Sequence, residues 1–464
     1  MADSDKKGFS LYVRLSMMMF LQFAVWGAWS VMIANHMESN LHFDGKHISY
    51  VFGTTAFGAI ISPLIAGWIA DRYMPNQIYT GLSHLVGAGL LYWAWFISAP
   101  VAAGVTAPFW PLEITMIVYA IFYFPTIGLT NAIAFHHMGD SNKFGLIRVW
   151  GSLGWIAVQT GLGFYLIHWN NLGVAQGLSQ GMVQDAAKQL GQALGNLHSR
   201  DCLMIATVAS VLMGFYSFTL PNTPPAKNAK NPYAFLEAFK LTENRNFAVL
   251  LIISFIVAIE LPFYYNLTSL FLANPTIQNG IGLGAGKAQF YMTFGQWGEV
   301  AMMALLYPMI RWGGIRWTIF LGILAWPVRY AIFSLGHPTW LVIASLPLHG
   351  ICYAFFFAGG MIAVERLAHK DIKASAQGLI VFATNGLGML VGHFLSGQIH
   401  DRMAYNVVDP ATGQTLIAHH WAGVFAVPIV VTVIAGIAFL ILWDEKQYQK
   451  DTAIIAAEPV EATA

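Results

Sequence analysis

Apolar stretches about as long as a bilayer is thick recur throughout the 464-residue chain. A helix needs about 20 mostly apolar residues to cross the hydrocarbon core of a membrane. Because backbone N–H and C=O groups cannot stay unpaired in hydrocarbon, such stretches are expected to cross it as helices. Twelve segments qualify as spanning helices, namely 11–36, 48–70, 77–99, 109–134, 144–168, 201–220, 246–272, 286–310, 315–335, 339–365, 374–398 and 420–443.

The composition excludes a large soluble core. Apolar residues make up 57% of the chain and charged residues 10%, whereas a soluble domain averages about 25% charged residues. The net charge of +1 offers no attraction to nucleic acid. Lys6 and Lys7 precede the first apolar segment, as in a signal peptide, but that segment is too long and no small-residue cleavage site closes it. We therefore predict an all-α, multi-pass membrane protein that retains its first span.

Basic residues set the expected orientation, because cytoplasmic loops of membrane proteins are enriched in Lys and Arg. Most of the 23 Lys and Arg residues fall in the two terminal tails and in the connections on the same side. We therefore expect both termini to face the cytoplasm. We expect the protein to lie in the plasma membrane, which is the inner membrane in bacteria. A charged, Pro-rich linker follows six spans. The predicted divisions are an N-terminal six-helix half 1–220, a cytoplasmic linker 221–245, a C-terminal six-helix half 246–443 and a cytoplasmic tail 444–464.

Polar side chains in several spans indicate a water-filled interior. A charged group deep in a membrane costs several kcal/mol unless it faces a cavity or a partner. At 1.5 Å per residue, Glu299 lies about 20 Å into its span, Glu260 lies about 14 residues in from the other side, and His349 lies about 10 residues into its span. Gln296 is three residues from Glu299 and shares its helix face. Transporter sites lie at this depth, at the interface of two repeats.

Two further spans carry polar and aromatic residues at helical spacing. Arg148, Ser152 and Trp155 follow the i, i+4, i+7 pattern in the fifth span. Arg148 also fits an arginine that snorkels to the membrane surface, because it lies near the start of that span. His349 and Tyr353 repeat the i, i+4 spacing in the tenth span, where His349 fits either a ligand contact or a core histidine. We expect His84 and His393 to be hydrogen-bonded core histidines.

One short motif suggests a gate. GWIADR (Gly67–Arg72) ends the second span and matches G-x-x-x-D-R, the loop signature of the major facilitator superfamily, without its usual trailing Gly-Arg-Arg. Gly67 would allow close helix approach, while Asp71 and Arg72 would latch a cytoplasmic gate. GQIHDR (Gly397–Arg402) repeats the pattern at the other face, by inverted repetition or by chance.

The sequence contains no recognisable constellation for catalysis. A paired nucleophile and base, a phosphate-binding glycine loop and metal-ligand spacing are all missing from it. Cys202 and Cys352 fall in separate apolar spans, which indicates small buried hydrophobes. We therefore expect no enzyme activity, cofactor or metal.

Several stretches together resemble the nucleoside:H+ symporter family of the major facilitator superfamily. They run in the same order through both halves and cover nearly the whole chain. The stretches are FLQFAVWGAW (Phe20–Trp29), HFDG (His42–Gly45), PTIGLTNAI (Pro125–Ile133), IRVWGSLG (Ile147–Gly154), QWGE (Gln296–Glu299) and ASAQG…TNGLG (Ala374–Gly388).

The resemblance implies a twelve-helix major facilitator fold and a nucleoside site built by the fifth, seventh, eighth and tenth helices. Proton coupling is expected at Glu299 or Glu260. The seventh helix departs from the family pattern, because Pro262 and Tyr265 stand where the family has amides. The tenth helix departs as well, because Ala354 stands where an aspartate is expected. By matching motifs and aromatic positions, the expected substrate-binding residues are Arg148, Ser152, Trp155, Tyr265, Gln296, Glu299, His349 and Tyr353.

The residue types suit a nucleoside on their own chemistry. A glutamine can pair bidentately with a base edge, aromatic rings can stack on the base, and Glu299 can accept from ribose hydroxyls. A desolvated carboxylate favours its protonated form, so it can carry a proton. The expected partners are a nucleoside, protons and the lipid bilayer, with no nucleic acid, and the expected oligomeric state is a monomer.

Three alternative functions remain open at this point. A proton-coupled sugar or oligosaccharide symporter would need the same carboxylates. A drug exporter would have a greasier cavity with fewer amides. A membrane-embedded enzyme would need a nucleophile or a metal cluster at one membrane face.

Overall fold

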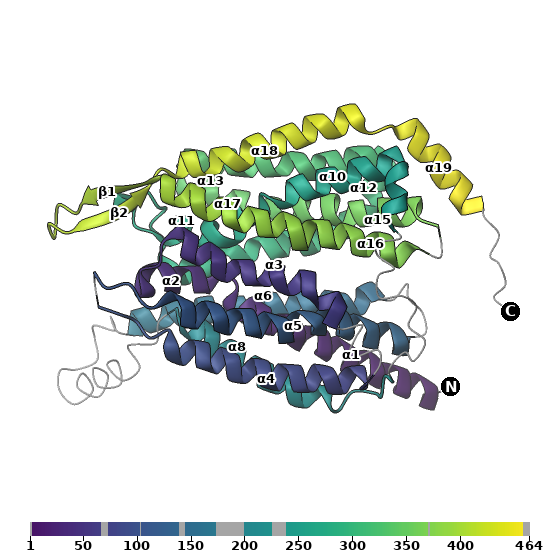
Figure 1. Cartoon of the computed structure of the whole chain (residues 1–464), viewed down its shortest axis with the longest axis horizontal. Helices are drawn as coiled ribbons and strands as arrows, with labels where there is room; N and C mark the ends of the chain where they lie inside the picture. The colour runs from purple at the N-terminus through teal and green to yellow at the C-terminus, as the bar shows by residue number, and fades with distance from the viewer. Residues whose placement is uncertain are drawn as a thin grey trace. The chain divides into compact units, whose positions relative to one another are not determined.

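A computed structural model describes residues 2–65, 73–102, 104–138, 144–172, 199–224, 238–369 and 372–457 of the chain. Within these residues the structure is mostly helical, and Figure 1 shows the helices as long ribbons. The first six predicted spans correspond to α1 (Ala2–Trp29) with α2 (Met32–Leu41), α3 (Gly45–Ile65), α4 (Asn76–Ile97), α5 (Phe109–Met138), α6 (Phe144–Leu172) and α8 (Asp201–Ser217).

The remaining spans are more broken than the sequence predicts. The seventh consists of α10 (Arg245–Ala258), η4 (Phe263–Leu267) and α11 (Thr268–Ala273). The eighth and ninth form one element, α12 (Gly284–Leu335), which turns at Gly314 with a φ of 74°. That positive φ is accessible to glycine without strain. The tenth span consists of α13 (Thr339–Ser345), α14 (Leu348–Ile351), η6 (Cys352–Ala358) and α15 (Gly359–Leu367). The eleventh consists of α16 (Lys373–Val381), η7 (Phe382–Gly388) and α17 (Met389–Arg402), and the twelfth is α18 (Trp421–Leu442).

Smaller elements complete the described chain. A β-hairpin of β1 (Ala404–Val408) and antiparallel β2 (Thr415–His419) follows α17 and lies beyond the ends of the helices in Figure 1. The short helix η3 (Ala238–Glu243) precedes α10, and the short helix η5 (Thr276–Gln278) follows α11. In the predicted C-terminal tail, residues Glu445–Ala457 form α19. The hairpin was not predicted from the sequence.

The hydrophobic lengths agree with a membrane protein. Seven helices among the described residues are long and apolar enough to cross a bilayer. Together with α3, α4, α6, α8 and the turn inside α12, they approximately support the predicted count of twelve. The predicted all-α membrane class is confirmed.

The chain packs as two compact units. The first unit comprises Met1–Lys227, Tyr264–Phe294 and Ser396–Trp421, and the second comprises Asn228–Phe263, Gly295–Leu395 and Ala422–Ala464. In the first unit α1 packs on α6 and α8, and α5 packs on α3 and α4. A Cβ atom added at Gly154 of α6 would collide with the backbone of Phe20 in α1. The two units are defined by how the chain packs in one conformation. The predicted division into halves at 221–245 therefore stays a prediction.

Polar contacts attach α19 within the second unit. The Asn246 side chain donates to the carbonyl of Asp444 at 2.9 Å and accepts from the Asp444 N–H at 2.9 Å. Asn244 caps α10 by accepting from the N–H of Phe247, and its amide donates to Asp451 of α19 at 2.7 Å. The start of the seventh span and the segment after α18 are therefore fixed to each other.

Candidate functional site

The structure divides the predicted site residues between the two units. The first unit contains Arg148, Ser152, Trp155 and Tyr265. The second unit contains Glu260, Gln296, Glu299, His349 and Tyr353. The predicted gating residues Gly67, Asp71 and Arg72 lie outside the described residues.

In the first unit, the polar face of α6 contacts aromatic residues of α1. The Arg148 guanidinium lies 3.9 Å from the centroid of the Phe23 ring, within the range of a cation–π interaction. The Trp155 ring meets Trp26 edge to face, with centroids 5.5 Å apart. Arg148 and Ser152 are half-buried. Arg148 thus has a defined aromatic partner, which a purely snorkelling arginine would not need.

A hydrogen-bonded histidine lies in the core of the same unit. His84 is buried, its Nε2 lies 2.9 Å from Gln22 Oε1, and its Nδ1 lies 3.1 Å from Ser210 Oγ. The Gln22 amide nitrogen donates to Thr126 at 2.9 Å. These bonds link α1, α4, α5 and α8, and they confirm that His84 is a satisfied core histidine.

In the second unit, Glu260 is held by the part of α12 that forms the ninth span. The Tyr330 hydroxyl donates to Glu260 Oε2 at 2.5 Å, and both side chains are fully buried. Arg329 interacts electrostatically with Glu260. The Arg329 guanidinium also lies 3.2 Å from His349 Nδ1. A polar chain therefore connects the seventh, ninth and tenth spans.

Sequence reasoning did not assign Arg329 and Tyr330 to the site. The available signal was Arg329 itself, since an arginine in mid-span needs a buried partner. The structure provides that partner as Glu260 together with His349.

Gln296 and Glu299 lie where α12 approaches the tenth span most closely. A Cβ atom at Gly298 would collide with the backbone of Pro347, and one at Gly350 would collide with Gly298 and Glu299. Gln296 is 7% exposed, and its Oε1 is shielded from solvent with no hydrogen-bond partner among the described residues. Glu299 is half-buried. The backbone contact therefore fixes this stretch of α12 against the tenth span.

Aromatic rings follow one another along the tenth span. The rings of His349 and Tyr353 have centroids 6.3 Å apart, and Tyr353 and Phe357 are 5.7 Å apart. Tyr353 and Phe357 lie in η6, a π-helical segment. Two more π-helical segments, η4 and η7, interrupt the seventh and eleventh spans. Such segments occur frequently at functional sites, because they shift which side chains face a given direction.

The π-helical η4 changes which polar residue of the seventh span is buried. Tyr265 is half-buried, whereas the next residue, Asn266, is fully buried. The Asn266 amide donates to Ser396 Oγ at 3.0 Å and to Ser49 Oγ at 3.4 Å. Sequence reasoning took position 265 as the replacement for an amide and did not consider Asn266.

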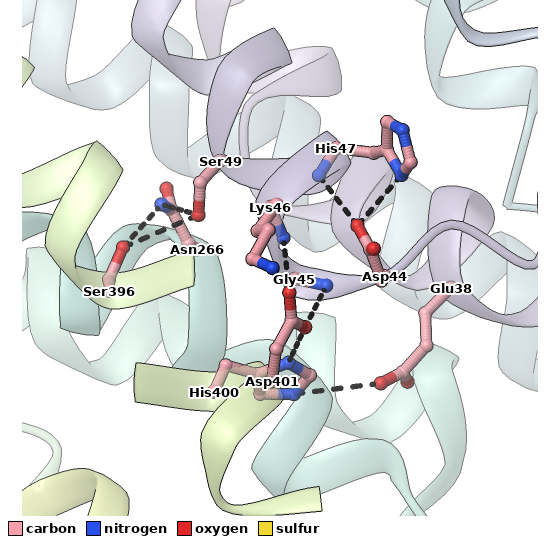
Figure 2. Close-up of polar contacts among 10 residues, drawn as sticks. All are labelled: Glu38, Asp44, Gly45, Lys46, His47, Ser49, Asn266, Ser396, His400 and Asp401. Atoms are coloured by element: carbon pink, nitrogen blue, oxygen red, sulfur yellow. Dashed lines mark hydrogen bonds and ion pairs between the residues drawn. The ribbon is translucent and has the colours of Figure 1, made fainter. Parts of the chain in front are cut away.

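The second copy of the G-x-x-x-D-R pattern has a structural partner (Figure 2). The Asp401 carboxylate accepts from the N–H of Gly45 at 2.6 Å and from that of Lys46 at 3.2 Å. These N–H groups begin α3, and a carboxylate stabilises a helix at this end. A Cβ atom at Gly397 would meet Ser49 and the backbone of Gly45. This pattern therefore joins the end of α17 to the start of α3.

Comparison with known proteins agrees with these features. A family model described as nucleoside H+ symporter matches residues 9–448. The chain is 31% identical to the putative nucleoside transporter YegT of Escherichia coli K12, over 93% of each chain. It is 29% identical to the xanthosine permease of the same organism, over 84% of this chain and 88% of the permease.

The fold also matches a solved structure. The crystal structure of the nucleoside transporter NupG superposes with a TM-score of 0.73 at 23% identity, covering 93% of this chain and 98% of NupG. This likeness confirms the predicted major facilitator fold. The family match spans nearly the entire sequence and includes both units. The chain belongs to the nucleoside H+ symporter family.

Proposed function

We propose that this protein imports nucleosides together with protons by alternating access. The family match and the relatives that transport nucleosides by name support this proposal. The observation that carries it is the Gln296–Glu299 pair. A buried amide oxygen with no hydrogen-bond partner costs free energy unless a ligand pairs with that side chain.

The proposed binding residues have distinct roles. Gln296 pairs with the edge of the base, and Glu299 accepts from the ribose hydroxyls. Trp155, Tyr265 and Tyr353 stack on or border the base. Arg148, Ser152 and His349 complete the proposed set of polar contacts.

Glu299 is the proposed proton carrier. Its helix neighbour Gln296 contacts the substrate in this scheme, so substrate and proton occupancy can influence each other. Glu260, the other predicted carrier, already accepts from Tyr330 and interacts with Arg329. These partners favour a structural role for Glu260, which links the seventh span to the ninth.

The membrane supplies the driving force in this scheme. Each positive charge that enters the cell gains about 2.3 kcal/mol per 100 mV of membrane potential. The termini and the linker face the cytoplasm in the proposed orientation. Gly67, Asp71 and Arg72 serve the cytoplasmic gate, and the protein acts as a monomer in the plasma membrane, the inner membrane of bacteria.

Substrate competition tests the proposal. Purified protein in proteoliposomes is given radiolabelled uridine or adenosine with an inward proton gradient, and unlabelled nucleosides or sugars are added in excess. We expect nucleosides to block uptake and sugars to leave it unchanged. Block by a sugar or an oligosaccharide, with labelled sugar accumulating instead, would favour the sugar symporter.

A further inference from the structure

Three side chains from distant parts of the sequence converge beside the Asp401–Gly45 contact. Glu38 lies in the last turn of α2, His400 lies in the last turn of α17, and His419 ends β2. One ligand atom from each residue lies within 4.8 Å of the other two. The carboxylate of Glu38 and the imidazole of His400 approach each other in Figure 2, with Oε1 and Nε2 3.9 Å apart.

The two histidines are buried in an unusual way. His400 is 2% exposed and His419 is 4% exposed. Both ring nitrogens of His400 and the Nδ1 of His419 are shielded from solvent and have no hydrogen-bond partner among the described residues. Burying such a polar atom without a hydrogen bond is unfavourable. An ion or a water molecule is a common reason for such atoms.

We propose that Glu38, His400 and His419 bind a divalent transition-metal ion of the Zn2+ class. Two imidazoles and one carboxylate are a ligand set that zinc proteins use, with a water molecule in the fourth position. Mg2+ and Ca2+ prefer oxygen ligands, so imidazole nitrogens select against both.

The surroundings of His400 fit a metal ligand. If Nε2 faces the ion, Nδ1 points toward Asp401, whose Oδ1 lies 3.6 Å away. A carboxylate behind a coordinating histidine fixes the ring and makes it a better ligand. The Asn274 side chain hydrogen-bonds Glu38, which orients the third ligand.

Binding requires a small rearrangement of the side chains. Ligand atoms around tetrahedral Zn2+ lie about 3.3 Å apart, given bonds of about 2.0–2.2 Å. The rings of His400 and His419 are stacked, with centroids 3.8 Å apart and planes 23° apart. The rings must turn so that one nitrogen of each converges on the ion. The Glu38 carboxylate, 3.9 Å from His400 Nε2, would approach the ion by rotation of its side chain.

The site would tie together segments that are far apart in the chain. Glu38 lies just after the first predicted span, whereas His400 and His419 lie at the two ends of the connection between the eleventh and twelfth spans. No metal-ligand spacing is recognisable in the sequence, because Glu38 is hundreds of residues away from both histidines, and His400 and His419 lie on different elements. An ion here would stabilise the same end of the first unit at which Asp401 caps α3.

Zinc binding to the purified full-length protein tests this inference, with any polyhistidine tag removed. Isothermal titration of the wild type in detergent is expected to show a Zn2+ site that Mg2+ does not fill. His400→Gln and His419→Gln are expected to lose this site, and Glu38→Gln to weaken it at least about 10-fold. The matched control is His420→Gln, because exposed His420 stacks on Tyr405 and should keep the site.

Thermal unfolding of the wild type gives a second measurement that does not depend on the folding of any variant. Zn2+ is expected to raise the melting temperature and a chelator to reverse the rise, because an ion that binds only the folded state stabilises it. No Zn2+-dependent rise in the wild type would overturn the proposal. Equal Zn2+ affinity and stoichiometry in the wild type and in folded His400→Gln and His419→Gln would overturn it as well.

Discussion

At the scale of single residues, the buried side chains of Glu260, His349 and Gln296 in the second unit differ in their polar contacts. Glu260 has its hydrogen bond to Tyr330, and His349 has its contact with Arg329. Gln296 instead presents a shielded amide oxygen with no hydrogen-bond partner among the described residues. The contacts of Glu260 and His349 hold helices together, whereas the shielded amide oxygen of Gln296 is suited to a ligand.

Truncation of Gln296 tests this distinction. Gln296→Ala is expected to weaken nucleoside binding by about 1–3 kcal/mol, because the base then loses a desolvated hydrogen-bond partner. Calorimetry with purified protein measures the affinity. The control is Gln447→Ala on α19, which should bind as the wild type does, because exposed Gln447 only donates its amide to Asp451. Wild-type affinity in Gln296→Ala would mean that this glutamine has a structural role.

The Glu260–Tyr330 bond predicts a loss of stability. Tyr330→Phe keeps the ring and removes the hydroxyl, so a buried carboxylate loses its donor at 2.5 Å. We expect a destabilisation of about 1–3 kcal/mol, seen as a lower melting temperature in detergent. Tyr12→Phe, at a partly exposed position of α1, is the control. An unchanged melting temperature in Tyr330→Phe would show that this bond contributes little.

At the scale of elements, the spans could be predicted and their interruptions could not. Hydrophobic length located each span, because the bilayer imposes about 20 apolar residues on any crossing helix. The break between Trp29 and Met32 and the π-helical segments η4, η6 and η7 leave that length almost unchanged. A π-helical turn changes which side chains face a given direction, and within η4 half-buried Tyr265 is followed by fully buried Asn266.

Backbone contact between α12 and α14 gives the element-scale prediction. Gly350→Ala would place a methyl group against the backbone of Gly298 and Glu299. Overpacking of this kind costs about 1–3 kcal/mol, and it would displace Glu299 as well. We expect a lower melting temperature and reduced nucleoside uptake.

Gly89→Ala in α4 is the matched control for this substitution. No atom lies within 4 Å of a Cβ added at Gly89, so alanine should be tolerated there, and its better helix propensity should be neutral or stabilising. If Gly350→Ala behaves like Gly89→Ala in both assays, the close approach of the two helices has no role in positioning Glu299.

At the scale of the whole molecule, the sequence was informative about class and less so about connections. The apolar lengths and motif order predicted the fold and family that the comparisons show. Residue type and depth indicated Glu260, Gln296, Glu299 and His349 as candidates. The pairing of Glu260 with Tyr330 and the meeting of Glu38, His400 and His419 depend on tertiary packing, which brings together residues with no regular spacing.

Proton coupling through Glu299 is the central claim at this scale, and one substitution addresses it. Glu299→Gln mimics the protonated carboxyl and cannot release a proton. Nucleoside binding and exchange should partly survive, because the amide keeps the size and hydrogen-bonding capacity of the side chain. Accumulation of nucleoside against its own concentration gradient should be lost. Glu365→Gln is the control, since Glu365 is exposed and pairs with Lys373 at 3.5 Å.

The deciding measurement is accumulation of radiolabelled nucleoside in proteoliposomes under an imposed pH gradient, with nucleoside counterflow measured in the same preparation. The account predicts that the wild type and Glu365→Gln concentrate nucleoside, while Glu299→Gln shows counterflow without concentration. If Glu299→Gln concentrates nucleoside as the wild type does, Glu299 does not couple protons to transport and the account is contradicted.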